Sequence, residues 1–182
     1  MRSVTVFVSW TCYGRWLHGS ERGSVVSDQN VPETPWLPPD PVMQSDERER
    51  MTQSPYSLDA ARRIVLIAIR EVCAHRGWTL HAVHVRATHV HAIVSGEHSP
   101  ERMLNDFKAY ASRALNAAGL DALERKRWTR HGSTRYINKD DYLAAAINYV
   151  LNKQGEPMER WPEDAGALPN GRGSLNANEP RP

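Results

Sequence analysis

The sequence predicts an α+β protein in which helices pack on the faces of a mainly antiparallel sheet, a ferredoxin-like or RRM-like sandwich. Three observations favour this class. Segments rich in β-branched and aromatic residues, typical of strands, alternate with segments whose apolar residues recur at helical spacing. Their order along the chain is strand, helix, strand, strand, helix, strand, helix. The length of 182 residues suits one core of this kind.

The first half of the chain begins with a strand and ends with a helix. Residues 4–13 alternate between apolar and other residues, which is typical of a strand. Residues 15–54 are rich in Gly, Pro and charged side chains and predict a long irregular insertion. A thick apolar stripe predicts a helix over residues 58–76, with Ser57 as its N-cap and Gly77 at its end.

A hairpin and a second helix are expected next. Residues 78–86 and 89–95 are two β-rich runs separated by a short break, as in a hairpin. The pair Ser99-Pro100 has the order of an N-cap followed by proline in the first turn. The helix that it begins carries one apolar face and ends at Gly119.

The last elements complete a domain over residues 1–156. Residues 128–138 predict a strand, and residues 139–153 predict a helix with Asn138 as its N-cap. The remaining residues, 157–182, are rich in Gly, Pro and Asn and predict a disordered tail.

Composition and charge limit the classes of protein to which this chain can belong. The net charge of +2 neither demands nor excludes a nucleic-acid partner, so the placement of the charges must decide. Cys12 and Cys73 lie far apart and predict neither a disulfide framework nor a thiolate metal site. The sequence shows no signal peptide and no apolar run long enough to span a bilayer, so we expect a cytoplasmic protein.

The histidine pair His89 and His91 is the sharpest local motif. Residues two apart in a strand point to the same face, so the two imidazoles project side by side while Val90 enters the core. Two imidazoles placed in this way can chelate one metal ion if a third ligand comes from elsewhere. His81 and His84, on the preceding strand, are expected to be a surface residue and a buried, hydrogen-bonded residue rather than further ligands.

Cations and aromatic residues alternate between residues 125 and 136, a composition that suits a groove for phosphates and stacked bases. The polar face of the second helix can extend this surface. The expected nucleic-acid contacts are Lys108, Arg113, Arg127, Trp128, Arg130 and Arg135.

Taken together, these features resemble the single-tyrosine HUH transposases of small bacterial insertion sequences and their REP-associated relatives. His89-Val90-His91 matches the histidine–hydrophobic–histidine motif, and Lys108-Ala109-Tyr110 matches a segment of the following helix. Tyr149 matches the nucleophilic tyrosine of the late helix. The resemblance covers about residues 3–156.

The resemblance implies a transposase that cleaves and rejoins single-stranded DNA, with hairpin element ends as substrate and a homodimer as a possible assembly. Tyr149 would form a 5′-phosphotyrosine, and His89 and His91 would hold a divalent ion, Mg²⁺ or Mn²⁺. In many members a glutamine four residues after the tyrosine completes the metal site. Lys153 occupies that position here, so Gln154 or Asn152 must supply the ligand, and we favour Gln154.

Two alternative functions remain open at the level of sequence. One is a non-catalytic, domesticated nucleic-acid-binding relative, which Lys153 in the usual ligand position favours. The other is a metal-independent RNA-processing enzyme on a similar frame, with histidines as general acid and base.

Overall fold

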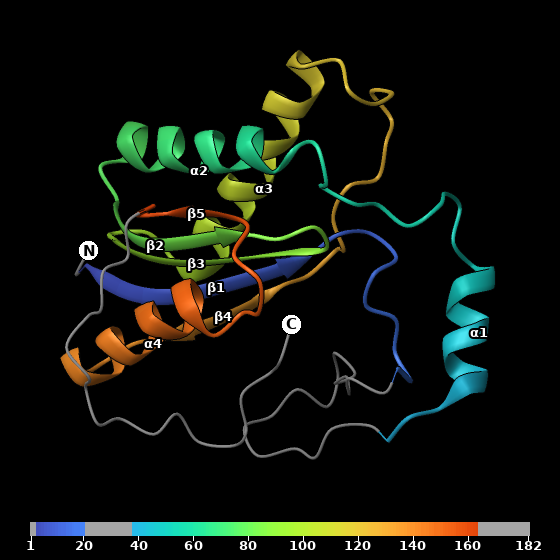
Figure 1. Ribbon diagram of the computed structural model, residues 1–182, viewed down its shortest axis with the longest axis horizontal. Coiled ribbons are helices and arrows are strands. Elements are labelled where there is room, and N and C mark those ends of the chain that lie inside the picture. Colours follow the sequence, from blue (N-terminus) through green and yellow to red (C-terminus); the bar gives the residue numbers. More distant parts are fainter. Residues whose placement is uncertain (1–2, 21–37, 164–182) are drawn as a thin grey trace.

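The computed structural model describes residues 3–20 and 38–163, and its centre is one five-stranded antiparallel sheet (Figure 1). The strands run in the order β4-β1-β3-β2-β5. The first four make the ferredoxin-like order, with β3 in the centre, so the predicted fold class is confirmed. Their bounds are Val4–Thr11 (β1), Thr79–Val85 (β2), His89–Gly96 (β3), Ser133–Tyr136 (β4) and Glu159–Trp161 (β5).

Helices cover both faces of the sheet. Helices α2 (Arg62–Arg76) and α3 (Pro100–Ala117) pack on one face over the larger core cluster. Helix α4 (Asp140–Asn152) packs on the other face, where Ala146, Val150 and Leu151 bury against apolar side chains of the sheet. Figure 1 shows α2 and α4 on opposite sides of the strands. The sheet is therefore the middle of three layers.

Strand alternation decides which side chains meet α4. On β3, Val90, Ala92 and Val94 join the core under α2 and α3. His89 and His91 alternate with these residues and project from the opposite face. The two histidines pair in register with Thr11 and Ser9 of β1, so they lie in the centre of the sheet on its α4 side.

Two helix boundaries follow the predicted signals, and two do not: the N-cap of α4 is Lys139 instead of Asn138, and the other exception is Ser57. The Ser99 side chain accepts from the Arg102 N–H at 3.3 Å, which caps α3. Helix α2 ends at Gly77, whose φ of 66° is the left-handed conformation that glycine adopts readily. Ser57 does not cap α2, because its hydroxyl donates to the Ala87 carbonyl and the helix begins only at Arg62.

Two segments are more ordered than the sequence predicts. Part of the 15–54 insertion forms helix α1 (Pro41–Glu49), which the Asp40 side chain caps and which lies apart from the sheet (Figure 1); residues 21–37 are outside the described residues. Strand β5 lies within the predicted disordered tail and pairs with β2, while residues 164–182 are outside the described residues. The expectation of a structureless tail is therefore wrong for residues 159–161.

In the described part of the chain, no helix combines the length and apolar character needed to cross a membrane.

Candidate active site

His89 and His91 form the centre of the candidate site. Their ring centroids lie 4.9 Å apart, and their side chains are only 8% and 1% exposed. The Thr88 hydroxyl lies 3.1 Å from Nδ1 of His89, a contact of the kind that fixes the orientation of a ligating imidazole. The predicted side-by-side placement on one sheet face is therefore present.

Tyr149 lies against this pair. Its ring centroid is 6.2 Å from that of His91 and 6.3 Å from that of Phe7. Phe7 in turn stacks on His91 at 5.4 Å. Residues far apart in the chain thus form one aromatic cluster on the α4 side of the sheet. Phe7 was not predicted to belong to the site. A signal was available, because Phe7 lies two residues before Ser9, the partner of His91, and therefore on the same face of the sheet.

The competing tyrosines lie elsewhere. Tyr110 belongs to α3, on the opposite face of the sheet, where it packs against the larger core cluster. Tyr136 and Tyr142 are 55% and 44% exposed. Of the six tyrosines, all of which lie in the described ranges, Tyr149 is the one whose ring contacts His91.

The end of α4 brings Gln154 towards the histidines. The helix ends at Asn152, and Lys153, with a φ of −114°, leaves the helical path before Gln154. Gln154 is half-buried, and its side chain lies close enough to His91 to offset a small part of the lowering of the imidazole pKa that burial causes. Asn152, in contrast, is exposed and donates to Asn148.

The chemistry of the donor set fits a divalent cation. Burial lowers the pKa of His91 well below its ordinary value, so this imidazole is neutral and its lone pair is available. Both its ring nitrogens are buried and have no hydrogen-bond partner in the described part of the chain. No group of three or more His, Cys, Asp or Glu residues able to hold a metal occurs within residues 3–20 and 38–163. The further donor beside the two histidines is the half-buried amide of Gln154, whose oxygen is of a type that divalent ions accept.

The cysteines do not add to this donor set. Cys12 and Cys73 are free and buried, and burial raises the pKa of each thiol to about 12. Neither forms the thiolate that binds metals.

Lys108 corrects an expectation about the nucleic-acid surface. Its side chain is buried, and Nζ donates to the carbonyl oxygens of Thr129 and His131 at 3.0 and 2.8 Å. Burial also lowers the pKa of its ammonium to about 8. Because its donors are used on the backbone, Lys108 supports the 129–131 segment instead of presenting a charge to phosphates.

This support gives a stability prediction. Lys108→Met should lower the free energy of unfolding in urea by about 1–3 kcal/mol, because the Thr129 carbonyl loses the Lys108 donor and the His131 carbonyl keeps only the Thr129 hydroxyl. Arg113→Met is the matched control, since Arg113 is exposed on the same helix and should change stability by no more than about 0.5 kcal/mol. Unchanged stability in Lys108→Met would contradict the supporting role.

Arg127 is buried, and Trp128 is partly buried against the core. Arg127 is 4% exposed, and its Nε donates to the Asp121 carboxylate at 3.0 Å. The Trp128 indole N–H donates to Ser112 at 2.8 Å, and its ring packs edge-on against Trp10. The expectation that Arg127 contacts nucleic acid is therefore corrected, and the expectation for Trp128 stays a prediction. Both are held in place by other residues.

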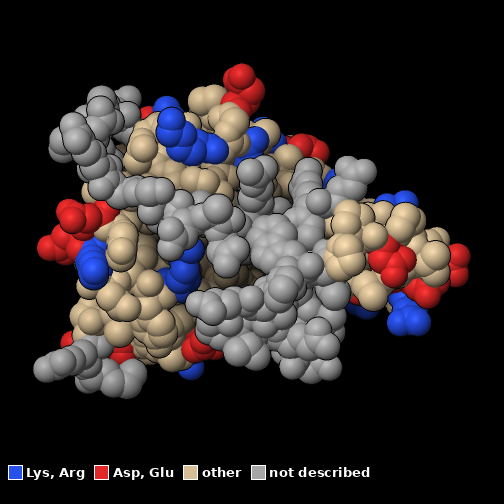
Figure 2. Space-filling view, turned by 90° about the horizontal axis from the view of Figure 1, so that it is seen from below, with Lys and Arg blue, Asp and Glu red and all other residues tan. Residues whose placement is uncertain are grey.

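The remaining predicted cations differ in their position. Arg130 is exposed, and Arg135 lies with its guanidinium 5.8 Å from the ring centroid of Phe7, beside the aromatic cluster. Arg113 lies over the ring of Tyr110, in the helical layer on the other side of the sheet. Viewed from the α4 side, the visible described surface mixes Lys and Arg with Asp and Glu (Figure 2). Among the predicted cations, Arg135 is therefore the one placed beside the aromatic cluster.

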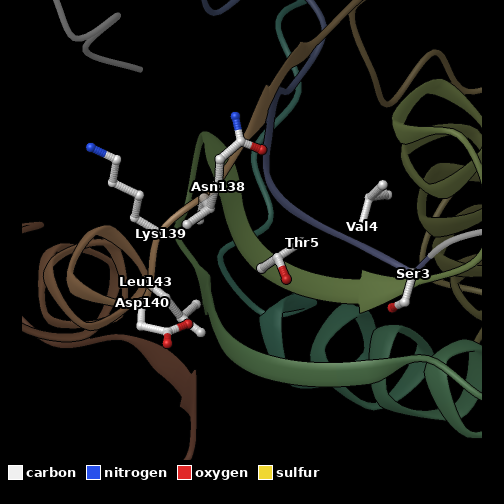
Figure 3. Close-up of a pocket in the computed structure, with 8 residues that line it drawn as sticks. Ser3, Val4, Thr5, Asn138, Lys139, Asp140 and Leu143 are labelled. Carbon is white, nitrogen blue, oxygen red and sulfur yellow. The ribbon is translucent and has the colours of Figure 1, made fainter.

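A separate pocket lies at the other end of the sheet. It has a volume of about 320 Å³ and is lined by the start of β1 and by the β4–α4 connection, including Thr5, Asn138 and Lys139 (Figure 3). Val4 pairs with Gly96, whereas the histidines pair with the last residues of β1. The pocket is thus distinct from the histidine site.

Together, the fold and the site define a class of protein: an α+β sheet that presents a His-hydrophobic-His pair to a tyrosine on a following helix. Residues 47–153 match the family described as "Transposase IS200 like". This match spans more than half of the 182 residues, and the chain belongs to that family.

Two solved structures are similar to the chain. One is a REP-associated tyrosine transposase bound to a REP hairpin, with 13% identity and a TM-score of 0.47, matched over 83% of this chain and 66% of that protein. The other is a candidate transposase from Deinococcus radiodurans R1, with 12% identity and a TM-score of 0.44, matched over 84% of this chain and 92% of that protein. No curated protein matches the chain.

Proposed function

We propose that this protein cleaves and rejoins single-stranded DNA, with Tyr149 as nucleophile and with His89, His91 and Gln154 as ligands of one divalent cation. The observation that carries the proposal is the 6.2 Å separation between the rings of Tyr149 and His91. A metal ion and a nucleophile can act on the same phosphate only if both lie within reach of it. Membership of the IS200-like transposase family supports the same reaction.

The cation would be Mn²⁺ or Mg²⁺, and two imidazole ligands favour Mn²⁺ or another transition ion. When bound, it would polarise the scissile phosphate and neutralise charge that develops in the transition state. The chain itself contributes the fixed imidazoles of His89 and His91 and the amide of Gln154. Because His91 is buried and neutral, it does not need to lose a proton before it coordinates.

The covalent step uses Tyr149. Its phenolic oxygen attacks the phosphorus in line and loses its proton to solvent, so that a tyrosine–phosphorus bond forms. The bond from phosphorus to the 3′ oxygen breaks, and that oxygen takes up a proton to become a free 3′-hydroxyl. The product is a 5′-phosphotyrosine. Attack by a 3′-hydroxyl on this linkage reverses the step and rejoins DNA without ATP.

The proposed substrate is single-stranded DNA, with hairpin element ends as the preferred form. A hairpin-bound REP-associated transposase among the similar structures motivates this choice. Arg135 beside the aromatic cluster and exposed Arg130 supply cations next to the site. Tyr149 and His91 lie together within a single chain, so one chain carries both groups of the proposed site.

The arginines give a prediction about salt dependence. The double variant Arg130→Ala/Arg135→Ala should bind hairpin DNA more weakly and lower the slope of log K against log salt by about 1.4–2 units, since each lost phosphate contact removes about 0.7–1. Fluorescence anisotropy across a salt series measures this slope. The double variant Arg48→Ala/Arg50→Ala removes two exposed charges near α1 and serves as the matched control. Equal slopes in the two double variants would rule out phosphate contacts by Arg130 and Arg135.

The function as a whole is tested by incubating the protein with DNA and RNA hairpins of equal sequence, with Mn²⁺ or with EDTA. The proposal expects cleavage and a covalent adduct with DNA, both lost in EDTA. Binding without cleavage would favour the non-catalytic relative. RNA cleavage that survives EDTA would favour the metal-independent enzyme.

A further inference from the structure

The C-terminal end of α4 and the chain just after it are attached to the sheet by three side chains. His84 on β2 is fully buried, and its Nδ1 donates to the Val150 carbonyl at 3.0 Å. Its Nε2 accepts from the Met158 N–H at 3.1 Å. The imidazole therefore bridges the residue after Tyr149 and the chain that follows the helix. Both ring nitrogens are used, which fixes a neutral tautomer.

Arg160 and Arg86 continue the attachment on either side of His84. Arg160 of β5 pairs in register with His84, and its guanidinium donates to the Leu151 carbonyl at 2.8 Å. Arg86 donates to the Glu156 carbonyl at 3.0 Å. The last carbonyls of a helix have no partner inside the helix, so His84 and Arg160 complete the end of α4, while Arg86 holds the chain just after it. Between the anchored residues lies Gln154.

His84 and Arg160 lie in one row across the strands with a member of the histidine pair. His84 of β2 pairs in register with His91 of β3, so Arg160, His84 and His91 lie next to one another across three strands on the α4 face. A displacement of the end of α4 would move Tyr149 and Gln154 together, relative to His91. Strand β5 lies outside the matched residues 47–153, so its contribution is not covered by the family match.

We propose that His84 and Arg160 are positioning residues, which hold Tyr149 and Gln154 in register with the histidine pair through the end of α4. This inference rests on the proposed function for its consequence in the reaction. Its structural part, the attachment of α4 to β2 and β5, is independent of that function. Supporting groups of this kind typically change activity or metal affinity by about 10–100-fold when removed.

The test compares Arg160→Met with Arg63→Met. Arg63 pairs with Glu159 and Glu163, so its removal alters contacts to the β5 region without touching α4. We expect Arg160→Met to slow adduct formation at saturating hairpin DNA by at least about 10-fold and to weaken Mn²⁺ binding, with the Kd for DNA unchanged. Arg160→Lys, which retains a donor, should recover part of the rate, and Arg63→Met should match the wild type.

Hydrogen exchange separates this inference from the proposed function. In Arg160→Met, peptides that cover residues 149–158 should exchange at least about 10-fold faster than in Arg63→Met, whether or not the wild type cleaves DNA. An inactive wild type would overturn the proposed function. The hydrogen-exchange rates would still show whether Arg160 attaches the end of α4 to the sheet. If Arg160→Met has the same exchange rates, Mn²⁺ affinity and adduct rate as the wild type, the positioning role is overturned. If Arg160→Met does not fold, Arg86→Met takes its place with the same expectations.

Discussion

Replacing Tyr149 by phenylalanine is expected to abolish the covalent protein–DNA adduct while leaving the fold and the DNA affinity unchanged. The substitution removes only the phenolic oxygen, so the ring contacts with His91 and Phe7 persist. No other tyrosine has a ring in contact with His91 in the described part of the chain. The measurement is a denaturing gel with a labelled hairpin oligonucleotide, after circular dichroism has shown that the variant is folded.

The matched control is Tyr142→Phe. Tyr142 belongs to the same helix but is 44% exposed and should form the adduct at the wild-type rate. Tyr110→Phe provides a second control from the opposite side of the sheet. An adduct that persists in Tyr149→Phe and disappears in Tyr110→Phe would contradict the choice of nucleophile.

Removing either histidine of the pair is the second large expected effect. His89→Ala and His91→Ala should each lower the cleavage rate by at least about a thousandfold, because several kcal/mol of transition-state stabilisation are lost with the metal ion. Binding to the hairpin should persist, since phosphate contacts by arginines do not depend on this pair. Single-turnover cleavage in Mn²⁺ gives the rate, and calorimetric titration with Mn²⁺ gives the metal affinity.

His81→Ala is the appropriate control for these variants. His81 lies on the neighbouring strand and is half-buried, and its Nε2 is hydrogen-bonded to the Ser95 hydroxyl at 2.7 Å. It should retain cleavage and Mn²⁺ binding. Metal-dependent cleavage at the wild-type rate in His89→Ala would remove the basis for the metal site.

Local patterns predicted the parts of the structure that depend on neighbouring residues. The hairpin and the capped helix α3 follow from alternation and from Ser99-Pro100, and both are confirmed. The placement of His89 and His91 on one sheet face follows from strand periodicity alone. The buried, hydrogen-bonded state expected for His84 is also confirmed, and burial lowers the pKa of its imidazole to about 4.

Local patterns did not predict which side chains are buried by tertiary packing. Charge and aromatic content between residues 125 and 136 predicted a nucleic-acid surface, yet Arg127 is buried in an ion pair with Asp121. Composition does not reveal whether a cation faces solvent or a partner in the interior. In the same way, Arg160 was missed because the sequence around β5 resembles a tail. Its pairing with β2 is a long-range contact that no local signal encodes.

The central claim is that Tyr149 attacks DNA beside the histidine pair, and the most direct measurement is a map of the covalent linkage. The wild-type protein is incubated with hairpin DNA and Mn²⁺, digested with a protease and a nuclease, and analysed by tandem mass spectrometry. The account predicts that the residual 5′-phosphonucleotide is attached to the peptide that contains Tyr149. Attachment to Tyr110 or Tyr142, or cleavage with no nucleotide on any tyrosine, would contradict it.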